Sequence, residues 1–275
     1  MTDQSVHPTD QPQPAMNGAE SVVRSLHGAG VEVCFANPGT SEMQFVDALD
    51  RTNLLRCVLG LFEGVATGAA DGYARMAHKP AVTLLHLAPG LANAGANMHN
   101  ARKARTPMVN LVGDHAVRHR DYDAPLTADV EGAARPFSDW VKTGTSPETF
   151  AAEAMEALGA ALSRPNRVAT LLAPADIGWA SGGVIAPPPA PPAYAPLADK
   201  DVSRAAELLG PDTVLFVGGR ALETPQSIAA LQGISARTGA KVLAPTSNRR
   251  VERGAGRAGL PRLPYPIDLA LETLA

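Results

Sequence analysis

The sequence predicts an α/β fold in which a parallel sheet is covered by helices on both faces. Short apolar runs alternate with helical patterns through the first 180 residues. Each run is apolar at nearly every position, as in strands that are buried on both sides. Glycine, proline or hydroxyl residues follow the runs, where turns are expected. A chain of 275 residues is long enough to bury such a sheet within one large or two modest domains.

The first part of the pattern begins at Asn17, where an amphipathic helix leads to Gly28 and Gly30. Glycine at this point is typical of a helix end. Strands are then expected at Val31–Ala36, Leu54–Leu61, Val82–Leu87, Met108–Val112 and Val168–Ala173, and helices at Gly64–Ala77, Asn93–Ala104 and Pro147–Leu162. A turn over residues 37–41 precedes one further helix, which has Glu42 in its first turn.

Composition divides the chain into four parts. Residues 1–15 are rich in glutamine, proline and threonine and are expected to form a disordered tail. Residues 16–180 form the first domain, and residues 181–199 a proline-rich linker. The α/β pattern restarts over residues 200–275, with helices at Asp201–Leu209 and Pro225–Thr238, strands at Thr213–Val217 and Lys241–Ala244, and a last helix from Asp268. Two strands are too few for a doubly wound domain, so we expect this second domain to be incomplete.

Charge and composition exclude several functional classes. The 24 Lys and Arg residues nearly balance 27 Asp and Glu residues, and no long basic run suggests a nucleic-acid surface. No run of about 18 apolar residues predicts a membrane span. The N-terminal segment lacks an apolar signal-peptide core, so the cytoplasm is the expected location. Cys34 and Cys57 both lie in apolar runs, which favours buried, reduced thiols.

The motifs of common nucleotide and metal sites are missing. The chain has no Gly-x-Gly-x-x-Gly and no phosphate-binding P-loop, and Gly218-Gly219 is interpreted as a structural turn. No spacing of histidine, cysteine or acidic residues predicts a metal site. Candidate chemistry is therefore confined to polar residues at the strand ends.

Glu63, His86 and His115 each follow a predicted strand, and the carboxyl ends of parallel strands meet at one sheet edge. We expect these three side chains to converge there. Because Glu63 opens a helix, local physics favours a capping acid over a ligand-binding one. The residues alone leave both readings open.

Four motifs, in order, resemble the thiamine diphosphate enzymes of the acetolactate synthase and benzoylformate decarboxylase type. They are Phe-Ala-Asn-Pro-Gly-Thr40, then Leu-Phe-Glu63-Gly-Val-Ala-Thr-Gly-Ala-Ala-Asp-Gly-Tyr-Ala-Arg75, then Leu-His-Leu-Ala-Pro-Gly-Leu-Ala-Asn93, then Pro107 with Val-Gly-Asp114. The resemblance implies that residues 17–178 form a pyrimidine-binding domain. It implies that residues 200–275 begin a Rossmann-like central domain.

The resemblance also implies roles for single residues. Glu63 would hydrogen-bond a ring nitrogen of the cofactor's aminopyrimidine and favour the imino tautomer that removes the thiazolium proton. This requires a carboxyl group in a dry pocket, while the carbon chemistry belongs to the cofactor. His86 matches a histidine that lies near the substrate carboxylate in some of the decarboxylases. The residues implied on the pyrimidine side of the cofactor are Asn37, Pro38, Gly39, Thr40, Pro89, Gly90 and Asn93.

Two departures from the acetolactate synthases leave the reaction open. Asp121–Leu126 stands where those enzymes have a Phe-Gln pair, and Ser138–Trp140 where a Lys-His follows. A 2-keto acid decarboxylase or carboligase is therefore as well supported as condensation of pyruvate. In either case the implied substrate is a 2-keto acid.

The third domain of the family binds the cofactor diphosphate through Mg²⁺, using Gly-Asp-Gly and a later asparagine. No such motif occurs in this chain, because Val-Gly-Asp-His115 and Ala-Asp-Gly-Tyr73 do not match it. Our main hypothesis is the N-terminal part of a thiamine diphosphate-dependent enzyme, inactive alone and assembled as a homodimer or tetramer. The alternative is a non-catalytic partner subunit that pairs with a separate diphosphate-binding chain.

Overall fold

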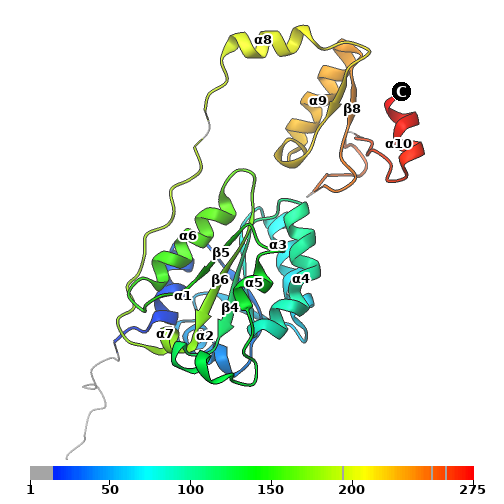
Figure 1. Ribbon diagram of the computed structural model, residues 1–275. Helices are drawn as coiled ribbons and strands as arrows, with labels where there is room; N and C mark the ends of the chain where they lie inside the picture. The colour runs from blue at the N-terminus through cyan, green and yellow to red at the C-terminus, as the bar shows by residue number, and fades with distance from the viewer. Residues whose placement is uncertain (1–14, 194, 249, 258) are drawn as a thin grey trace, which may run out of the picture.

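The computed structural model describes residues 15–193, 195–248, 250–257 and 259–275. The tail expected over residues 1–15 lies outside these ranges except for Ala15. The main feature is a six-stranded sheet of order β2-β1-β3-β4-β6-β5, in which all paired strands are parallel (Figure 1). The strands are β1 (Val33–Asn37), β2 (Arg56–Leu59), β3 (Ala81–Leu85), β4 (Met108–Asp114), β5 (Trp140–Thr143) and β6 (Val168–Pro174). The predicted α/β fold class is confirmed.

The strand order reverses direction at β1. The chain passes outward from β1 to β2 and then returns to place β3 on the other side of β1. The loops that follow β1 and β3 therefore leave the sheet in opposite directions. Ligands of open α/β sheets bind at such a switch point, beyond the carboxyl ends of the strands.

Helices cover both faces of the sheet (Figure 1). One core lies under α1 (Gly18–Gly28), α2 (Met43–Thr52) and α6 (Phe150–Leu162). The other lies under α3 (Glu63–Ala77), α4 (Leu87–Lys103) and the short α5 (Val130–Ala134). The short helix α7 (Ala175–Trp179) contacts α1 and α2.

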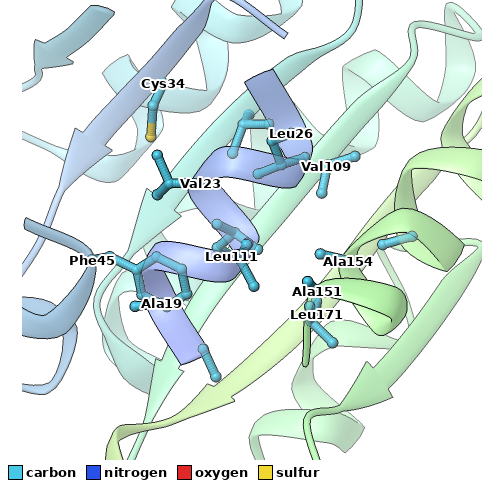
Figure 2. Packing of buried hydrophobic residues seen from close by; sticks show 14 of the residues in the cluster. Ala19, Val23, Leu26, Cys34, Phe45, Val109, Leu111, Ala151, Ala154 and Leu171 are labelled. Atoms are coloured by element: carbon cyan, nitrogen blue, oxygen red, sulfur yellow. The ribbon is translucent and has the colours of Figure 1, made fainter. Parts of the chain in front are cut away.

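Helix α1 shows how the sequence forms and buries one of these elements. The side chain of Asn17 accepts a hydrogen bond from the Glu20 amide, which satisfies one of the free N–H groups at the helix start. The apolar face of the helix carries Val22, Val23 and Leu26, all buried against the sheet. Figure 2 shows Val23 and Leu26 packed beside Cys34 of β1 and Val109 of β4.

A row of polar side chains crosses the centre of the sheet. Thr83 of β3, Asn110 of β4 and Thr170 of β6 are paired in register and fully buried. Thr83 donates to Asn110 Oδ1 at 2.7 Å, and Asn110 Nδ2 contacts the Thr170 hydroxyl at 3.3 Å. The hydroxyl groups of Ser138 and Thr170 lie 2.6 Å apart at the end of the row. Each buried polar group thus has a partner, as burial requires.

Two sequence expectations near the site are corrected. Strand β2 is shorter than expected and is the edge strand of the sheet, so Cys57 is exposed although Cys34 is buried. The expected loop at Ala88 and Gly90 is helical, because α4 begins at Leu87. Proline is tolerated there because the first turn of a helix does not use its N–H groups for internal bonding.

The second unit is smaller. Residues 181–193 of the expected linker contain no helix or strand, and helix α8 (Asp199–Glu207) follows. Strands β7 (Val214–Phe216) and β8 (Lys241–Leu243) form a parallel pair, and α9 (Pro225–Thr238) contacts β8. Helix α10 (Ile267–Leu274) comes last in the chain. Its buried cluster among the described residues consists of Leu222, Ala244 and Leu260. The sequence analysis missed the short elements η1 (Thr40–Glu42), η2 (Val117–Tyr122), η3 (Gly219–Leu222), α5, β5 and α7.

Candidate functional site

Glu63 begins helix α3 just beyond the end of β2 and is 6% exposed. Its Oε2 accepts a hydrogen bond of 2.9 Å from the side-chain amide of Asn93 in α4. Its backbone carbonyl accepts a bond from the hydroxyl of Thr67, one turn further along α3. A buried carboxylate at this position also lies at the positive end of the helix dipole. Glu63 is thus held by its own helix and by the neighbouring one.

The other carboxylate oxygen of Glu63 lies against the first turn of α4. A side chain at Gly90 would place its Cβ 2.7 Å from Glu63 Oε1, which is too close for any residue except glycine. Leu87, at the start of the same turn, is buried and has a left-handed backbone with φ of 49°. Such a conformation is strained for leucine, and strain of this kind gathers at functional sites.

A second acid, Glu42, lies at the same edge of the sheet and is fully buried. Its Oε2 accepts the backbone N–H of Gly39 at 2.7 Å and lies 2.8 Å from Nδ1 of His86. Its Oε1 has no hydrogen-bond partner in the part of the chain that the structure describes. That oxygen lies where a side chain at Gly113 would be, so only glycine at the end of β4 leaves room for the carboxylate.

Burial raises the pKa of Glu42 above its usual range, because a charged carboxylate loses its hydration inside the protein. Hydrogen bonds from the Gly39 amide, the His86 ring and the Leu87 amide act in the opposite direction. Burial is the largest of these causes. The switch point therefore contains an acid that takes up a proton more readily than an exposed glutamate does.

The structure gathers most of the predicted site residues into two adjoining groups. The Glu63 group contains Asn93 and Gly90, and the Glu42 group contains Gly39 and His86. A backbone hydrogen bond of 2.7 Å from the Gly90 amide to the His86 carbonyl connects the two. The expected neighbourhood of Glu63 and His86 is thus realised through the first turn of α4, with no direct contact between their side chains recorded among the described residues.

The remaining candidates lie around these groups. Asn37 is the last residue of β1, paired with Leu85, and Pro38 lines a cavity beside β2. Thr40 lines a second cavity of about 410 Å³ together with His115, so His115 lies at the edge where it was expected. Its Nε2 is buried and has no hydrogen-bond partner among the described atoms.

Sequence reasoning missed the part that Glu42 plays at this edge. It placed this residue only as an acid in the first turn of a helix. Its partner His86 is 44 residues away in the chain, and no local pattern connects the two. The signal that could have found it is Gly113, a glycine inside a buried apolar strand, which marks a close approach by another group.

Apolar side chains that neighbour Glu63 in the chain are exposed to solvent. Leu61 is 94% exposed, and Leu59, Phe62 and Val65 are also exposed. Large apolar side chains gathered at a buried acid are typical of a surface that another molecule or another part of a protein covers.

The described residues contain no group of three or more His, Cys, Asp or Glu side chains placed to hold a metal ion. Within the same residues, no helix is both long enough and apolar enough to cross a membrane.

Comparison with known proteins agrees with the geometry of this edge. Residues 16–135 match the family described as "Thiamine pyrophosphate enzyme, N-terminal TPP binding domain". The chain belongs to the thiamine pyrophosphate enzyme family. The matched region contains both acids, His86 and the glycines that make room for the acids. The resemblance found in the four motifs is thereby confirmed.

Individual relatives point to the same family. The chain is 48% identical over 252 residues to a Mycobacterium tuberculosis protein named "Putative acetolactate synthase large subunit IlvX", with 91% of this chain and 48% of that protein covered. It is 36% identical over 121 residues to acetolactate synthase isozyme 3 large subunit of Escherichia coli, covering 44% of this chain and 21% of the relative. The acetolactate synthase-like character of the N-terminal domain is thus confirmed.

A solved structure shares the fold. The thiamine diphosphate-dependent 4-hydroxybenzoylformate decarboxylase of Rhodococcus jostii superposes with a TM-score of 0.73 at 22% identity, covering 85% of this chain and 45% of that one. The chain spans about half the length of the Mycobacterium tuberculosis relative and of this structure. What those whole proteins do is therefore not transferred to this chain by similarity alone.

Proposed function

We propose that this chain forms the pyrimidine-binding side of a thiamine diphosphate site in an acetolactate synthase-like enzyme that processes 2-keto acids. Membership of the thiamine pyrophosphate enzyme family supports this proposal. The single observation that carries it is Glu63, a buried carboxylate at a helix N-terminus, with one oxygen on an amide and the other against glycine backbone.

The residues around Glu63 fit the aminopyrimidine of that cofactor. Burial favours proton sharing between the carboxyl group and a weak ring base, since water does not compete for the proton. Asn93 fixes Oε2 by a 2.9 Å hydrogen bond, so a contact with the ring nitrogen falls to the opposite oxygen, Oε1. Glycine at position 90 lets the first turn of α4 approach Oε1, since a side chain there would place its Cβ 2.7 Å from that oxygen. When bound, thiamine diphosphate supplies a thiazolium ring that stabilises the carbanion formed from a 2-keto acid.

In this proposal His86 is a second catalytic residue, placed near the carboxylate of the substrate. Glu42 contacts Nδ1 of the ring, so a contact with substrate falls to Nε2. The Glu42 carboxylate also fixes the orientation of the ring, as a carboxylate partner commonly does for a working histidine. The residues proposed to line the cofactor beside Glu63 are Asn37, Pro38, Gly39, Thr40, Pro89, Gly90 and Asn93.

The site requires a second surface. We propose that the exposed apolar side chains around Glu63, Leu61 above all, are covered by the part that binds the diphosphate and Mg²⁺. That part belongs to another subunit of a homodimer or tetramer, or to a separate chain. The same exposed surface supports the second candidate function, a non-catalytic partner subunit whose only contribution is this contact.

The substitution Glu63→Gln separates these two functions. In the enzyme assembled with its diphosphate-binding part, it should slow exchange of the thiazolium proton by at least about 100-fold, since general acid–base groups contribute on this order. Exchange is measured by loss of the proton signal in deuterated buffer. The glutamine carbonyl still accepts from Asn93, so the melting temperature should stay close to that of the wild type. Exchange at the wild-type rate would rule out the catalytic assignment and leave the partner-subunit function.

A further inference from the structure

The two cysteines lie side by side on neighbouring strands, near the beginning of each strand. Cys34 of β1 and Cys57 of β2 are paired in the parallel register. Paired residues of adjacent parallel strands point to the same face, and their strands lie about 4.8 Å apart. This separation falls within the range of about 4.4–6.8 Å between the Cα atoms of disulfide-bonded cysteines.

The two thiols differ in access to solvent. Cys34 is part of the core beneath α1 and α2, and Figure 2 shows its sulfur directed toward Val23. Cys57 is exposed on the edge strand and lines a cavity of about 690 Å³ beside α2. A reagent dissolved in water can therefore reach Cys57 but not Cys34.

The pKa values of the two thiols also differ, and the accessible thiol has the lower one. A hydrogen bond from the Cys34 thiol lowers the pKa of Cys57 to about 7. The same contact, together with burial, raises the pKa of Cys34. The charged side chains that line the cavity beside Cys57 are Glu32, Asp50 and Arg56. A thiolate is the nucleophilic form of cysteine, so the accessible sulfur is also the reactive one.

We propose that Cys34 and Cys57 form a reversible thiol–disulfide pair, in which Cys57 reacts with a hydroperoxide and Cys34 resolves the product. Neither cysteine is among the residues proposed to bind the cofactor or the substrate. It adds a modification site to a chain whose two cysteines the sequence assigns to inert, buried thiols.

The reaction balances in two steps. The Cys57 thiolate attacks hydrogen peroxide: a sulfur–oxygen bond forms, the oxygen–oxygen bond breaks, and hydroxide leaves and takes up a proton as water. Cys57 is then a sulfenic acid. The Cys34 sulfur attacks the Cys57 sulfur, the sulfur–oxygen bond breaks, and the second oxygen leaves as water with the Cys34 proton. Two thiols and one peroxide give one disulfide and two waters.

The crosslink would act close to the candidate site. Strand β1 leads from Cys34 to Asn37, and β2 leads from Cys57 toward Glu63. Beyond the cysteines the two segments stay joined, because the backbone amide of Gly60 donates to the Ala36 carbonyl at 2.8 Å. A disulfide would fix the edge strand to its neighbour at the base of these two segments.

The test treats the purified full chain with a small excess of hydrogen peroxide and then blocks free thiols with N-ethylmaleimide. We expect the chain to lose two hydrogen masses and both alkylation sites. Trypsin should then yield a reducible crosslink between the peptides Ser25–Arg51 and Cys57–Arg75. Chains joined to one another through Cys57, with Cys34 still alkylated after denaturation, would overturn the proposal, as would survival of both thiols.

Two variants assign the separate roles. In Cys34→Ala, peroxide should leave a sulfenic acid at Cys57 that dimedone traps, whereas in Cys57→Ala the buried Cys34 should remain reduced. Trapping at Cys34 instead would reverse the assignment and refute it. Circular dichroism melts of the reduced proteins confirm that each variant folds, and the wild-type crosslink decides the proposal even if one variant does not.

The pH dependence of alkylation gives a second readout without peroxide. In the wild type, the rate at Cys57 should rise to half its maximum near pH 7, the pKa given by its contact with Cys34. In Cys34→Ala the midpoint should move toward about 8.5, the ordinary cysteine value, which makes alkylation at pH 7 roughly 15-fold slower because less of the thiol is ionised. An unchanged midpoint would show that the Cys34 thiol does not contact Cys57 and would refute the pair.

Discussion

Glu42 and Glu63 are both buried carboxylates at one edge of one sheet, yet their surroundings differ. Glu63 opens a long helix and bonds an amide of the neighbouring helix. Glu42 lies in the short helix η1, bonds a histidine ring and a backbone amide, and has one oxygen without a partner among the described residues. Glu42 is held through Oε2 by the Gly39 amide and the His86 ring. Glu63 has one oxygen on the Asn93 amide and the other against Gly90.

The largest expected effect is a loss of stability when a side chain is placed against the Glu42 carboxylate. A Cβ at Gly113 would overlap the Glu42 carboxylate, which cannot move without breaking its bonds to Gly39 and His86. Gly113→Ala should therefore lower the free energy of unfolding by about 3 kcal/mol. Chemical denaturation measures this loss.

Gly72→Ala is the matched control. Gly72 lies inside helix α3, and a Cβ there would meet no atom within 4 Å. Alanine should stabilise this helix by about 0.5–1 kcal/mol. If Gly113→Ala is tolerated as well as the control, Glu42 does not occupy the space against β4.

The second effect is the part of the pH dependence of the free energy of unfolding that the titration of Glu42 contributes. Because burial raises its pKa, the folded protein binds this proton more tightly than the unfolded chain does. The contribution of Glu42 to stability is therefore fully present at acidic pH and is lost as pH rises from about 4.5 through the raised pKa, by at most about 1.4 kcal/mol per pH unit. Glu42→Gln should remove this part of the slope.

The measurement is the free energy of unfolding across that pH window in the wild type and in Glu42→Gln. A variant with the wild-type slope would contradict the assignment to Glu42. The same variant also tests whether the Glu42 carboxylate holds the His86 ring, since a glutamine at this position cannot provide the negative charge beside the ring.

The smallest expected effect comes from removing the hydrogen bond that Asn93 donates to Glu63. Asn93→Ala removes the amide from Glu63 Oε2 and should cost about 1 kcal/mol of stability, typical of one hydrogen bond. Asn97→Ala, one turn further along α4, removes a bond of 2.6 Å to the Gly64 carbonyl and should cost a similar amount. Only Asn93→Ala should also slow cofactor proton exchange in the assembled enzyme. Equal exchange rates in the two variants would show that the amide does not act through Glu63.

Local signals allowed much of the secondary structure to be predicted. The helix expected over Pro225–Thr238 has these bounds in the structure. Thr224 caps its first turn by accepting the Ser227 amide, and Gly239 ends it with a left-handed backbone. Both are signals that lie in the sequence itself.

What the sequence did not predict depends on contacts between distant segments. Helix α4 begins six residues earlier than expected, at a leucine with positive φ, which only the surrounding fold can impose. Cys57 follows an apolar pattern typical of a buried strand, but β2 lies at the edge of the sheet, and strand order is not written in local periodicity. Among the site residues, Glu63 was singled out by its place between a predicted strand and a helix, and its proposed role came from the resemblance to the family. The contact of Glu42 with His86 has no local signal at all.

The buried polar row across β3, β4 and β6 affects the register in which these strands pair. A strand that is apolar along its whole length can slip by two residues and still bury apolar side chains on both faces. Here such a slip would separate Asn110 from Thr83 and Thr170 and leave buried polar groups without partners. Unpaired groups of this kind cost about 1–3 kcal/mol each. The row therefore favours a single register of β3, β4 and β6. That register fixes where these strands end, and with it the positions of the residues around Glu42 and Glu63.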